Sequence, residues 1–386
     1  MGLVSQHMPH LSKPQAAVLA MWSFGIVMSK SCGLTTVSSF MASLLGQKEN
    51  TVRQRLREWY RNDEAKKGLH RAELEVTSCF VPLVGWILSW WASDERRLAV
   101  AIDASTLGEL FVVLAVSLVY RGCAIPVAWV ILPATAKGEW KKHWLALFAQ
   151  LETAIPPDWT VIVLADRGLY AQWLYQEIVR IGWHPFLRLK TGGPYRPKGQ
   201  AHFRSLALAA PKVGTAWCGL VTCFKTNPLD CTLLARWDDP HEEPWLIITD
   251  LSPEQADVVW YGMRAWIECG FKQTKRAGWQ WQYTRMTDPD RASRLWLALA
   301  VATLWVVSVG GEAEATLPAS GLAELPESHI ARQRSPKGFQ PRLLSCFRRG
   351  ILVIMAALLT NQPIPFGRFY PEPWPSSTSF PDLEFT

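Results

Sequence analysis

The sequence predicts a mixed α/β fold in which a helical segment precedes a sheet with helices on its faces. Two observations lead to this prediction. Helical patterns occupy residues 13–95, and from Leu98 onward short apolar runs typical of strands alternate with helical ones. The chain has 386 residues, of which 49% are hydrophobic and 19% charged. It is therefore long and apolar enough to bury a substantial core.

Residues 1–95 are predicted to form a helical, DNA-binding domain. Its expected helices are Pro14–Lys30, Leu34–Leu45 and Thr51–Tyr60. Asn50 is placed to cap the third helix, and the turn at residues 46–49 resembles the turn of a helix-turn-helix. Arg53 and Arg57 make the third helix a candidate for reading DNA, although a basic face in water explains the same residues equally well.

Strands and helices then alternate through residues 96–191. The expected strands are Leu98–Ile102, Leu110–Tyr120, Cys123–Leu132, Trp159–Ala165 and His184–Leu189. Helices are expected over Trp144–Ile155 and Ala171–Ile181, and a hairpin turn at Arg121–Gly122. Three adjacent strands followed by helix, strand, helix and strand fit a ribonuclease-H-like catalytic core better than a purely alternating parallel sheet.

The remaining chain is predicted in three parts. A β-rich insertion spans residues 192–258, the second part of the core spans 259–310, and a loop, a helix and a tail fill 311–386. The expected elements are strands around Ala216–Phe224, Thr232–Trp237 and Trp245–Thr249, helices from Pro253 to Ala277, Asp290 to Val309 and Arg342 to Thr360, a loop over Glu312–Gln340, and a surface tail from Gln362.

Charge and cysteine usage limit the possible partners. The net charge of +7 suggests a polyanionic partner, although a basic protein that binds nothing acidic has the same charge. The eight cysteines form no C-x-x-C pair, which argues against a zinc site and suits a reducing cytoplasm. The apolar runs Phe80–Ala92 and Leu295–Val309 are shorter than the roughly 20 residues that cross a bilayer, so we expect core helices and no membrane partner.

Two aspartates end apolar, strand-like runs. Asp103 follows LAVAI and Asp166 follows VIVLA. A carboxylate at such a place costs free energy unless something compensates its charge, and a metal ion does so. Taken alone, each aspartate is explained just as well as an ordinary residue of the turn that follows a strand.

A third acidic residue lies in the segment YGMRAWIECGFKQTK, residues 261–275. Four of its side chains fall on one narrow stripe of a helix, at about 100° per residue: Tyr261, Arg264, Glu268 and Lys275. Salt bridges on a solvated helix face would explain such a stripe. They would not explain the two aspartates at the ends of matching strands.

The spacing Y-(2)-R-(3)-E-(6)-K resembles the signature of the insertion-sequence-four group of bacterial DDE transposases, and every spacing is met here. AIDAS around Asp103 and LADRGLY around Asp166 are similar to the two aspartate motifs of that group. The resemblance covers roughly residues 95–310, including the β-rich insertion. It implies an enzyme that cleaves transposon ends and transfers the strands into target DNA, by cut-and-paste through hairpin ends.

The resemblance also implies that Asp103, Asp166 and Glu268 are the catalytic residues and hold two Mg²⁺ ions per site, for which Mn²⁺ can substitute. Mg²⁺ prefers oxygen ligands. In a displacement at phosphorus, two such ions activate the attacking oxygen and stabilise the leaving one.

Basic side chains near the acidic ones are expected to bind DNA. Arg264 and Lys275 lie beside the glutamate on the same stripe, where they can neutralise phosphates, with Tyr261 close to them. Arg167, directly after the second aspartate, is expected to extend this contact.

The insertion carries three tryptophans on or beside its short strands: Trp217, Trp237 and Trp245. Aromatic side chains stack on unpaired bases, a contact worth roughly 1–3 kcal/mol per base. We expect at least one of the three to receive the base that a DNA hairpin flips out, whereas the packing of a small core explains any one of them singly.

The expected partners are double-stranded DNA, as terminal inverted repeats and target, and a second copy of the chain in the DNA complex. The expected location is the bacterial cytoplasm, at the nucleoid. Two other functions share part of the pattern. A ribonuclease-H-like nuclease that only hydrolyses DNA needs the three carboxylates but not the stripe, and a domesticated DNA-binding protein that no longer cuts needs neither.

Overall fold

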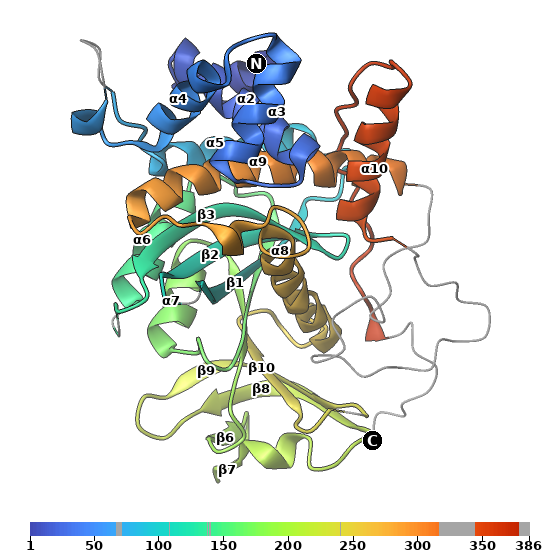
Figure 1. Ribbon diagram of the computed structural model, residues 1–386. Helices are drawn as coiled ribbons and strands as arrows, with labels where there is room; N and C mark the ends of the chain where they lie inside the picture. The colour runs from blue at the N-terminus through green and yellow to red at the C-terminus, as the bar shows by residue number, and fades with distance from the viewer. Residues whose placement is uncertain are drawn as a thin grey trace.

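The computed structural model describes residues 1–66, 72–107, 109–136, 138, 140–239, 241–315 and 344–377. Within these ranges, strands join into one sheet in the order β3-β2-β1-β4-β5-β10-β9-β8-β6-β7. The first half of the sheet lies beneath the helical part of the molecule, and the second half extends away from it at the bottom of Figure 1. The chain is therefore a mixed α/β protein.

Strands β1 to β5 form the first half of the sheet. Their bounds are β1 (Arg97–Leu107), β2 (Phe111–Tyr120), β3 (Cys123–Pro133), β4 (Thr160–Ala165) and β5 (His184–Arg188). β2 is antiparallel to β1 and β3, whereas β4 is parallel to β1 and β5 to β4. The turn between β2 and β3 has φ of 47° at Arg121 and 76° at Gly122, which matches the twist of a tight hairpin. Helices α6 (Lys141–Leu151) and α7 (Gln172–Arg180) follow β3 and β4, in the predicted order.

The predicted β-rich insertion is a continuation of the same sheet. Its strands are β6 (Pro194–Pro197), β7 (Arg204–Ser205), β8 (Thr215–Cys223), β9 (Leu229–Trp237) and β10 (Trp245–Thr249). β10 pairs antiparallel with β5, with Ile247 opposite Arg188. The segment therefore pairs along the edge of β5 that would otherwise be open. The backbone N–H and C=O groups of β10 form hydrogen bonds with those of β5.

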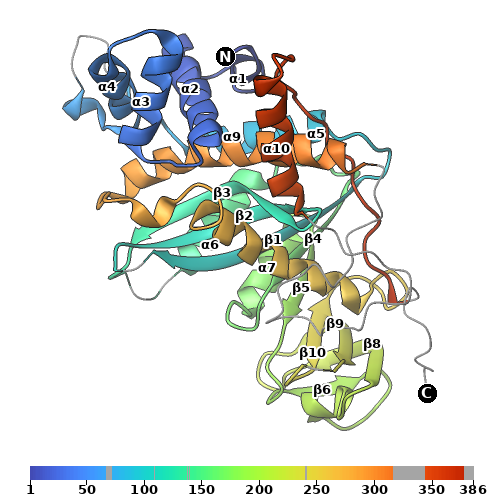
Figure 2. The ribbon, with the colours of Figure 1, turned by 45° about the vertical axis from the view of Figure 1, so that its right-hand side comes forward.

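Helix α9 (Pro289–Ala313) is the central helix of the molecule. It crosses one face of the sheet and separates it from the N-terminal helices (Figure 2). By length and apolarity it is able to cross a membrane, but 94% of its apolar window is buried inside the protein. The prediction of a core helix at this place is confirmed.

The predicted N-terminal helices are present as α2 (Lys13–Ser29), α3 (Leu34–Leu45), α4 (Glu49–Tyr60) and α5 (Phe80–Ser89). A further short helix, α1 (Gly2–His7), precedes them and was not predicted. The predicted cap at Asn50 is wrong, because α4 already begins at Glu49 with Lys48 at its N-cap. The Lys48 carbonyl accepts hydrogen bonds from Thr51 and Val52, which starts the helix before Asn50.

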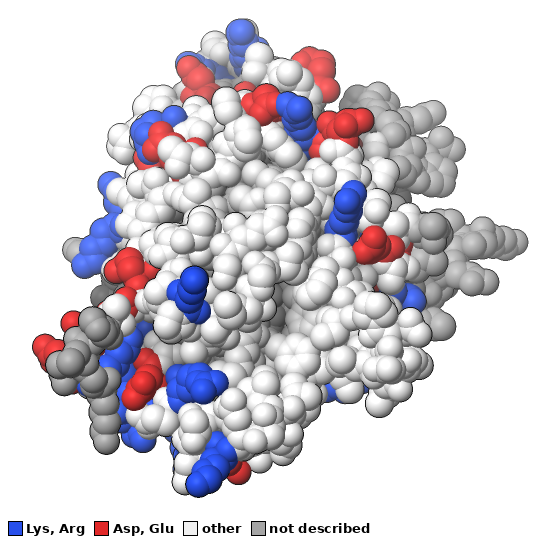
Figure 3. All heavy atoms as spheres, turned by 90° about the horizontal axis from the view of Figure 1, so that it is seen from above, with Lys and Arg blue, Asp and Glu red and all other residues white. Residues whose placement is uncertain are grey.

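The face formed by the helical part carries charges of both signs around a broad uncharged area (Figure 3). An apolar pocket of about 600 Å³ lies on the helical side, among α1, α2, α9 and the segment that follows α10 (Cys346–Leu359). Its lining includes Leu3, Phe24, Trp305 and Phe366. Because its charges are of both signs and surround an uncharged area, the side of the molecule seen in Figure 3 is not a continuous basic surface.

Two predictions for the C-terminal half need correction. The single helix expected from Pro253 to Ala277 is a 3₁₀-helix, η4 (Val258–Ala265), followed by α8 (Trp266–Thr274). Asp257 starts η4 by accepting a hydrogen bond from the Val259 amide, so the preceding residues stay outside it. Most of η4 is buried, and this packing, rather than the helix propensity of its residues, determines its 3₁₀ conformation.

The surface tail expected from Gln362 is wrong in part: residues 362–368 are mostly exposed, but residues 369–377 pack on the protein. Phe369 is fully buried, and its backbone amide and carbonyl bond to Trp90 and Ala92. Residues 369–377, which we call the C-terminal strap, lie against the sheet and η4 because their aromatic and charged side chains find buried partners there. Most of the loop expected over Glu312–Gln340 falls outside the described residues.

Candidate active site

Asp103 lies on β1 and faces the side of the sheet on which η4 and α8 pack. Ala99 and Ala101 share that face, because alternate residues of a strand point to the same side, and both belong to the apolar cluster that contains Tyr261 and Ile267. The Asp103 side chain is 16% exposed. Its Oδ1 accepts a 2.7 Å hydrogen bond from the Ala104 amide.

Asp166 directly follows β4, the parallel neighbour of β1. Because Ile102 pairs with Ala165, the next residue of each strand lies at the same edge. Asp166 Oδ1 accepts hydrogen bonds from the amides of Gly168 (2.9 Å) and Leu169 (3.1 Å). A Cβ at Gly168 would lie only 3.2 Å from that oxygen, so a glycine suits the turn that holds this carboxylate.

Glu268 belongs to the first turn of α8, where the partial positive charge of the helix N-terminus favours a carboxylate. Two residues later Gly270 packs on β3, and a Cβ there would lie 2.9 Å from Ala124 Cβ and 3.1 Å from its carbonyl oxygen. This close approach brings α8 against the sheet and its glutamate toward the two aspartates.

One guanidinium, that of Arg264, contacts all three carboxylates. Its Nη2 lies 2.7 Å from Asp103 Oδ2 and 3.5 Å from Asp166 Oδ2. Its Nη1 lies 2.5 Å from Glu268 Oε1. Arg264 is only 6% exposed, and its Nε is a buried donor without a partner among the described residues. The structure thus gathers the predicted acidic residues around a single buried cation.

Burial controls the protonation of this cluster. The pKa of Asp103 is raised to about 6, chiefly by burial; Arg264 and the Ala104 amide oppose the shift, and the charges of Asp166 and Glu268 add to it. Burial lowers the pKa of Arg264, but the nearby carboxylates, Asp103 above all, outweigh burial and leave it raised. Arg264 therefore stays charged, and Asp103 is the carboxyl group whose ionisation the fold opposes.

The three carboxylates are suitable ligands for a hard divalent cation, because they offer only oxygen donors. Among the described residues, however, no three or more His, Cys, Asp or Glu side chains are arranged to hold a metal ion as they stand. The guanidinium of Arg264 lies among these oxygens. The donor set therefore fits Mg²⁺ in chemistry, and a rearrangement at Arg264 is required.

The other two residues of the expected stripe lie in different environments. Tyr261 is 5% exposed and packs edge-on against Trp245, with ring centroids 5.2 Å apart, and burial raises its pKa to about 12. Lys275 is the residue after α8, and its Nζ donates 2.7 Å hydrogen bonds to Ser105 Oγ and Thr106 O of β1. Burial lowers the pKa of Lys275. Sequence reasoning missed Ser105, although it lies only two residues beyond Asp103.

The remaining candidates lie outside this cluster. Arg53 and Arg57 are exposed on α4. Arg167, half exposed beside Asp166, pairs with Glu243 from the end of the insertion. Of the three tryptophans, Trp217 and Trp237 are partly exposed. Trp245 is 7% exposed and belongs to the core between η4 and the sheet.

Comparison with known proteins gives one family match. Residues 119–305 match the family described as the transposase DDE domain. The matched range contains Asp166, Arg264, Glu268 and Lys275, and it begins after Asp103. No curated protein matches the chain. The family match supports a DDE-type transposase, an enzyme class that cleaves nucleic acid and transfers strands.

Proposed function

We propose that this DDE-type transposase cleaves the ends of its own insertion sequence and joins them to target DNA, with Asp103, Asp166 and Glu268 as its catalytic residues. The observation that carries the proposal is their convergence on Arg264 from three separate elements. Its resemblance to the insertion-sequence-four group extends the proposal to cut-and-paste through hairpin ends.

Asp103, Asp166 and Glu268 would hold two Mg²⁺ ions, or Mn²⁺ in their place. Bound there, the ions supply an acidified water and charge stabilisation at the phosphorus centre. The protein's own contribution is position: the Gly168 and Leu169 amides orient the Asp166 carboxylate, and close packing of α8 on β3 orients Glu268.

We assign Arg264 two successive roles. Without DNA it neutralises the three carboxylates, and with DNA it turns to a phosphate beside the cut. Its buried Nε, which has no hydrogen-bond partner among the described residues, supports such a movement, since an unsatisfied buried donor costs about 1–3 kcal/mol. Lys275, already beside Asp103 through Ser105 and Thr106, is placed to bind a phosphate next to the same site.

The surrounding fold supports the rest of the assignment. The order β3-β2-β1-β4-β5 is consistent with a ribonuclease-H-like core, and the insertion extends it. For stacking on a flipped base we retain Trp217 and Trp237, which are partly exposed, in preference to the buried Trp245. Arg167 and Tyr261 would support the DNA path, the first at the surface and the second from the core. The enzyme would act on nucleoid DNA in the cytoplasm, as a homodimer on paired ends.

The deciding experiment is cleavage of DNA that carries the element's own ends, with Mg²⁺, for the wild type and Asp103→Asn. We expect wild-type cleavage followed by joining to target DNA, and loss of both in the variant with end binding retained. Cleavage without joining would instead indicate a nuclease. Equal activity of the variant, or full activity after chelation, would contradict the assigned site. In the same assay Trp217→Ala or Trp237→Ala should accumulate nicked DNA, and normal hairpin yield in both would remove the stacking role.

A further inference from the structure

The C-terminal strap, residues 369–377, is attached to the protein at several points along its length. At its start, Phe369 bonds through its backbone to Trp90 and Ala92. The Tyr370 carbonyl then accepts hydrogen bonds from the Tyr120 hydroxyl (2.9 Å) and Arg121 Nε (2.8 Å). Glu372 pairs with Arg121 at 3.7 Å, and both side chains are less than a tenth exposed. The strap therefore follows a defined path across the hairpin of β2 and β3.

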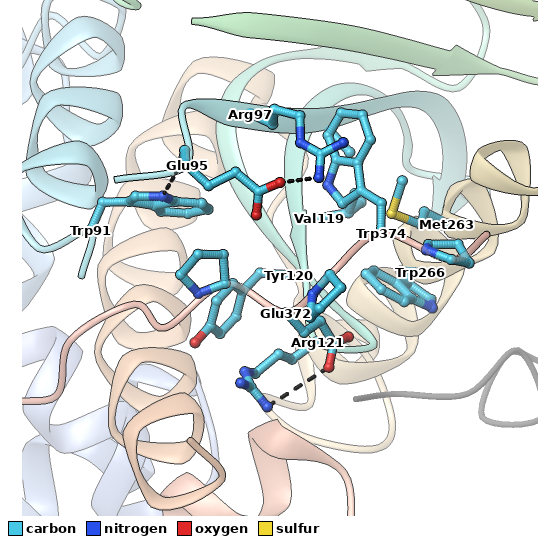
Figure 4. A pocket seen from close by; sticks show the side chains of 14 residues that line it. Trp91, Glu95, Arg97, Val119, Tyr120, Arg121, Met263, Trp266, Glu372 and Trp374 are labelled. Carbon is cyan, nitrogen blue, oxygen red and sulfur yellow. Dashed lines mark hydrogen bonds and ion pairs between the residues drawn. The ribbon is translucent and has the colours of Figure 1, made fainter. Parts of the chain in front are cut away.

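At its other end the strap contacts η4, the segment that carries Arg264. The Trp374 ring lies edge-on to Trp260 of η4, with centroids 4.9 Å apart. The guanidinium of Arg97, the first residue of β1, lies 4.8 Å from the Trp374 ring centroid. Figure 4 shows Trp374 between Arg97 on one side and Met263 and Trp266 on the other. Only about 30 Å³ of free space remains there, enough for about one water molecule.

The last contact is made at the N-cap of η4. Asp257 Oδ1 accepts from the Val259 amide, and its Oδ2 accepts from the amide (2.7 Å) and the hydroxyl (3.0 Å) of Ser377. The strap thus holds the side chain that starts η4. η4 is eight residues long, whereas 3₁₀-helices rarely exceed three or four residues because their hydrogen bonds are poorly aligned. A segment of this kind depends on contacts from outside for its conformation.

We propose that the C-terminal strap positions η4 and α8 for catalysis, with Trp374 and Ser377 as the positioning residues. They act through Asp257 and Trp260 on the backbone that carries Arg264 and, at the start of α8, Glu268. Neither touches the carboxylate cluster. The catalytic part of this inference rests on the proposed function, whereas the structural part does not.

The test uses full-length Ser377→Ala, Trp374→Ala and Trp374→Phe, with Ser345→Ala as the matched control. Ser345 caps α10 by accepting from the Arg348 amide, so the control also removes one hydrogen bond of a serine hydroxyl, at a helix away from η4. By hydrogen exchange, we expect Ser377→Ala and Trp374→Ala to exchange about tenfold faster over residues 257–275, with the strands of the sheet unchanged. Trp374→Phe should restore slow exchange, and Ser345→Ala should affect α10 alone.

The same variants are then assayed on DNA. Ser377→Ala and Trp374→Ala should lower the single-turnover cleavage rate about tenfold while end affinity stays at the wild-type value, and Trp374→Phe should recover the rate. Ser377→Ala removes the hydroxyl bond to Asp257 but keeps the amide bond, so it is read together with Trp374→Ala. Faster exchange confined to residues 257–275 in either variant supports the strap's role. Unchanged exchange there in Ser377→Ala, with exchange in Trp374→Ala either unchanged or faster everywhere, overturns it. Faster exchange there with an unchanged cleavage rate overturns its link to catalysis, and absence of wild-type cleavage counts against the proposed function alone.

Discussion

At the scale of single residues, the fold opposes the negative charge of Asp103, which the proposed metal binding requires. A folded-state pKa of about 6, above the ordinary value of 3.8, means that the fold favours the protonated form. The stability that this provides is complete below the unfolded-state pKa and is lost as pH rises through about 6. The shift corresponds to about 3 kcal/mol.

Asp103→Asn, which keeps the side chain neutral, should therefore stabilise the metal-free, DNA-free protein progressively from pH 4 to pH 7. We expect the difference in Tm between variant and wild type, measured with chelator present, to grow across this range and to level off above it. Asp94→Asn, the same substitution at an exposed position, serves as the control for the loss of one carboxylate. A pH-independent difference for Asp103→Asn would mean that its ionisation is not linked to folding.

Arg264 is the counter-ion of three carboxylates, so its removal should have opposite effects with and without metal. Arg264→Ala should lower the Tm in chelator, since breaking a buried ion pair costs about 3–5 kcal/mol. Added Mg²⁺ should then raise the Tm more than in the wild type, because no guanidinium competes for the carboxylates. Arg96→Ala, which breaks an exposed pair with Asp158, is the control and should change neither value. An identical Mg²⁺ response in Arg264→Ala and wild type would show that Arg264 does not occupy the place of a cation.

At the scale of elements, α4 combines a buried face with a basic one. Val52, Leu56 and Trp59 are buried, whereas Arg53 and Arg57 are exposed. The double variant Arg53→Glu/Arg57→Glu should fold normally but bind transposon ends at least about tenfold more weakly, with a smaller dependence on salt. Gel-shift titrations at several salt concentrations measure both effects. The double reversal Lys212→Glu/Arg348→Glu, also on exposed residues, controls for net charge. Equal losses in the two double variants would locate end recognition away from α4.

At the scale of the whole molecule, α9 joins the helical domain to the sheet. Arg294 is 4% exposed and donates to the carbonyls of Tyr60 and Leu74. Ser23 of α2 donates to the Ala298 carbonyl, and Trp59 of α4 to the Arg294 carbonyl. The helical domain thus covers one side of α9 while the sheet covers another.

Deletion of residues 1–68 should therefore expose the apolar side of α9 and leave an aggregation-prone protein, although the predicted catalytic core keeps its whole sequence. This expectation differs from that for a helical domain joined only by a linker. The soluble fraction and thermal unfolding of the truncated chain measure it, with the Arg53→Glu/Arg57→Glu variant as a soluble control. A soluble truncated protein with a cooperative unfolding transition would show that the core folds without its helical cover.

Local patterns in the sequence were sufficient for most of the elements. Apolar runs of strand length predicted β1 to β5, and the long apolar helix at Asp290–Val309 was recognised as part of the core. The same patterns identified the acidic residues of the candidate site, because two of them end such runs and the third lies in a segment with a specific spacing. These signals are local: each depends on residues within a turn or a strand of one another.

Contacts between distant residues were decided only by the tertiary structure. Arg264 meets Asp103 across 161 residues, and the strap meets Asp257 across 120 residues. The pairing of β10 with β5, and the burial that turns one expected helix into η4 and α8, depend on packing in the same way. A linear pattern records which side chains are apolar or charged. The pairing of buried charges depends on the free energy of the whole folded structure. A buried charge without a partner costs free energy, and a close opposite charge offsets that cost.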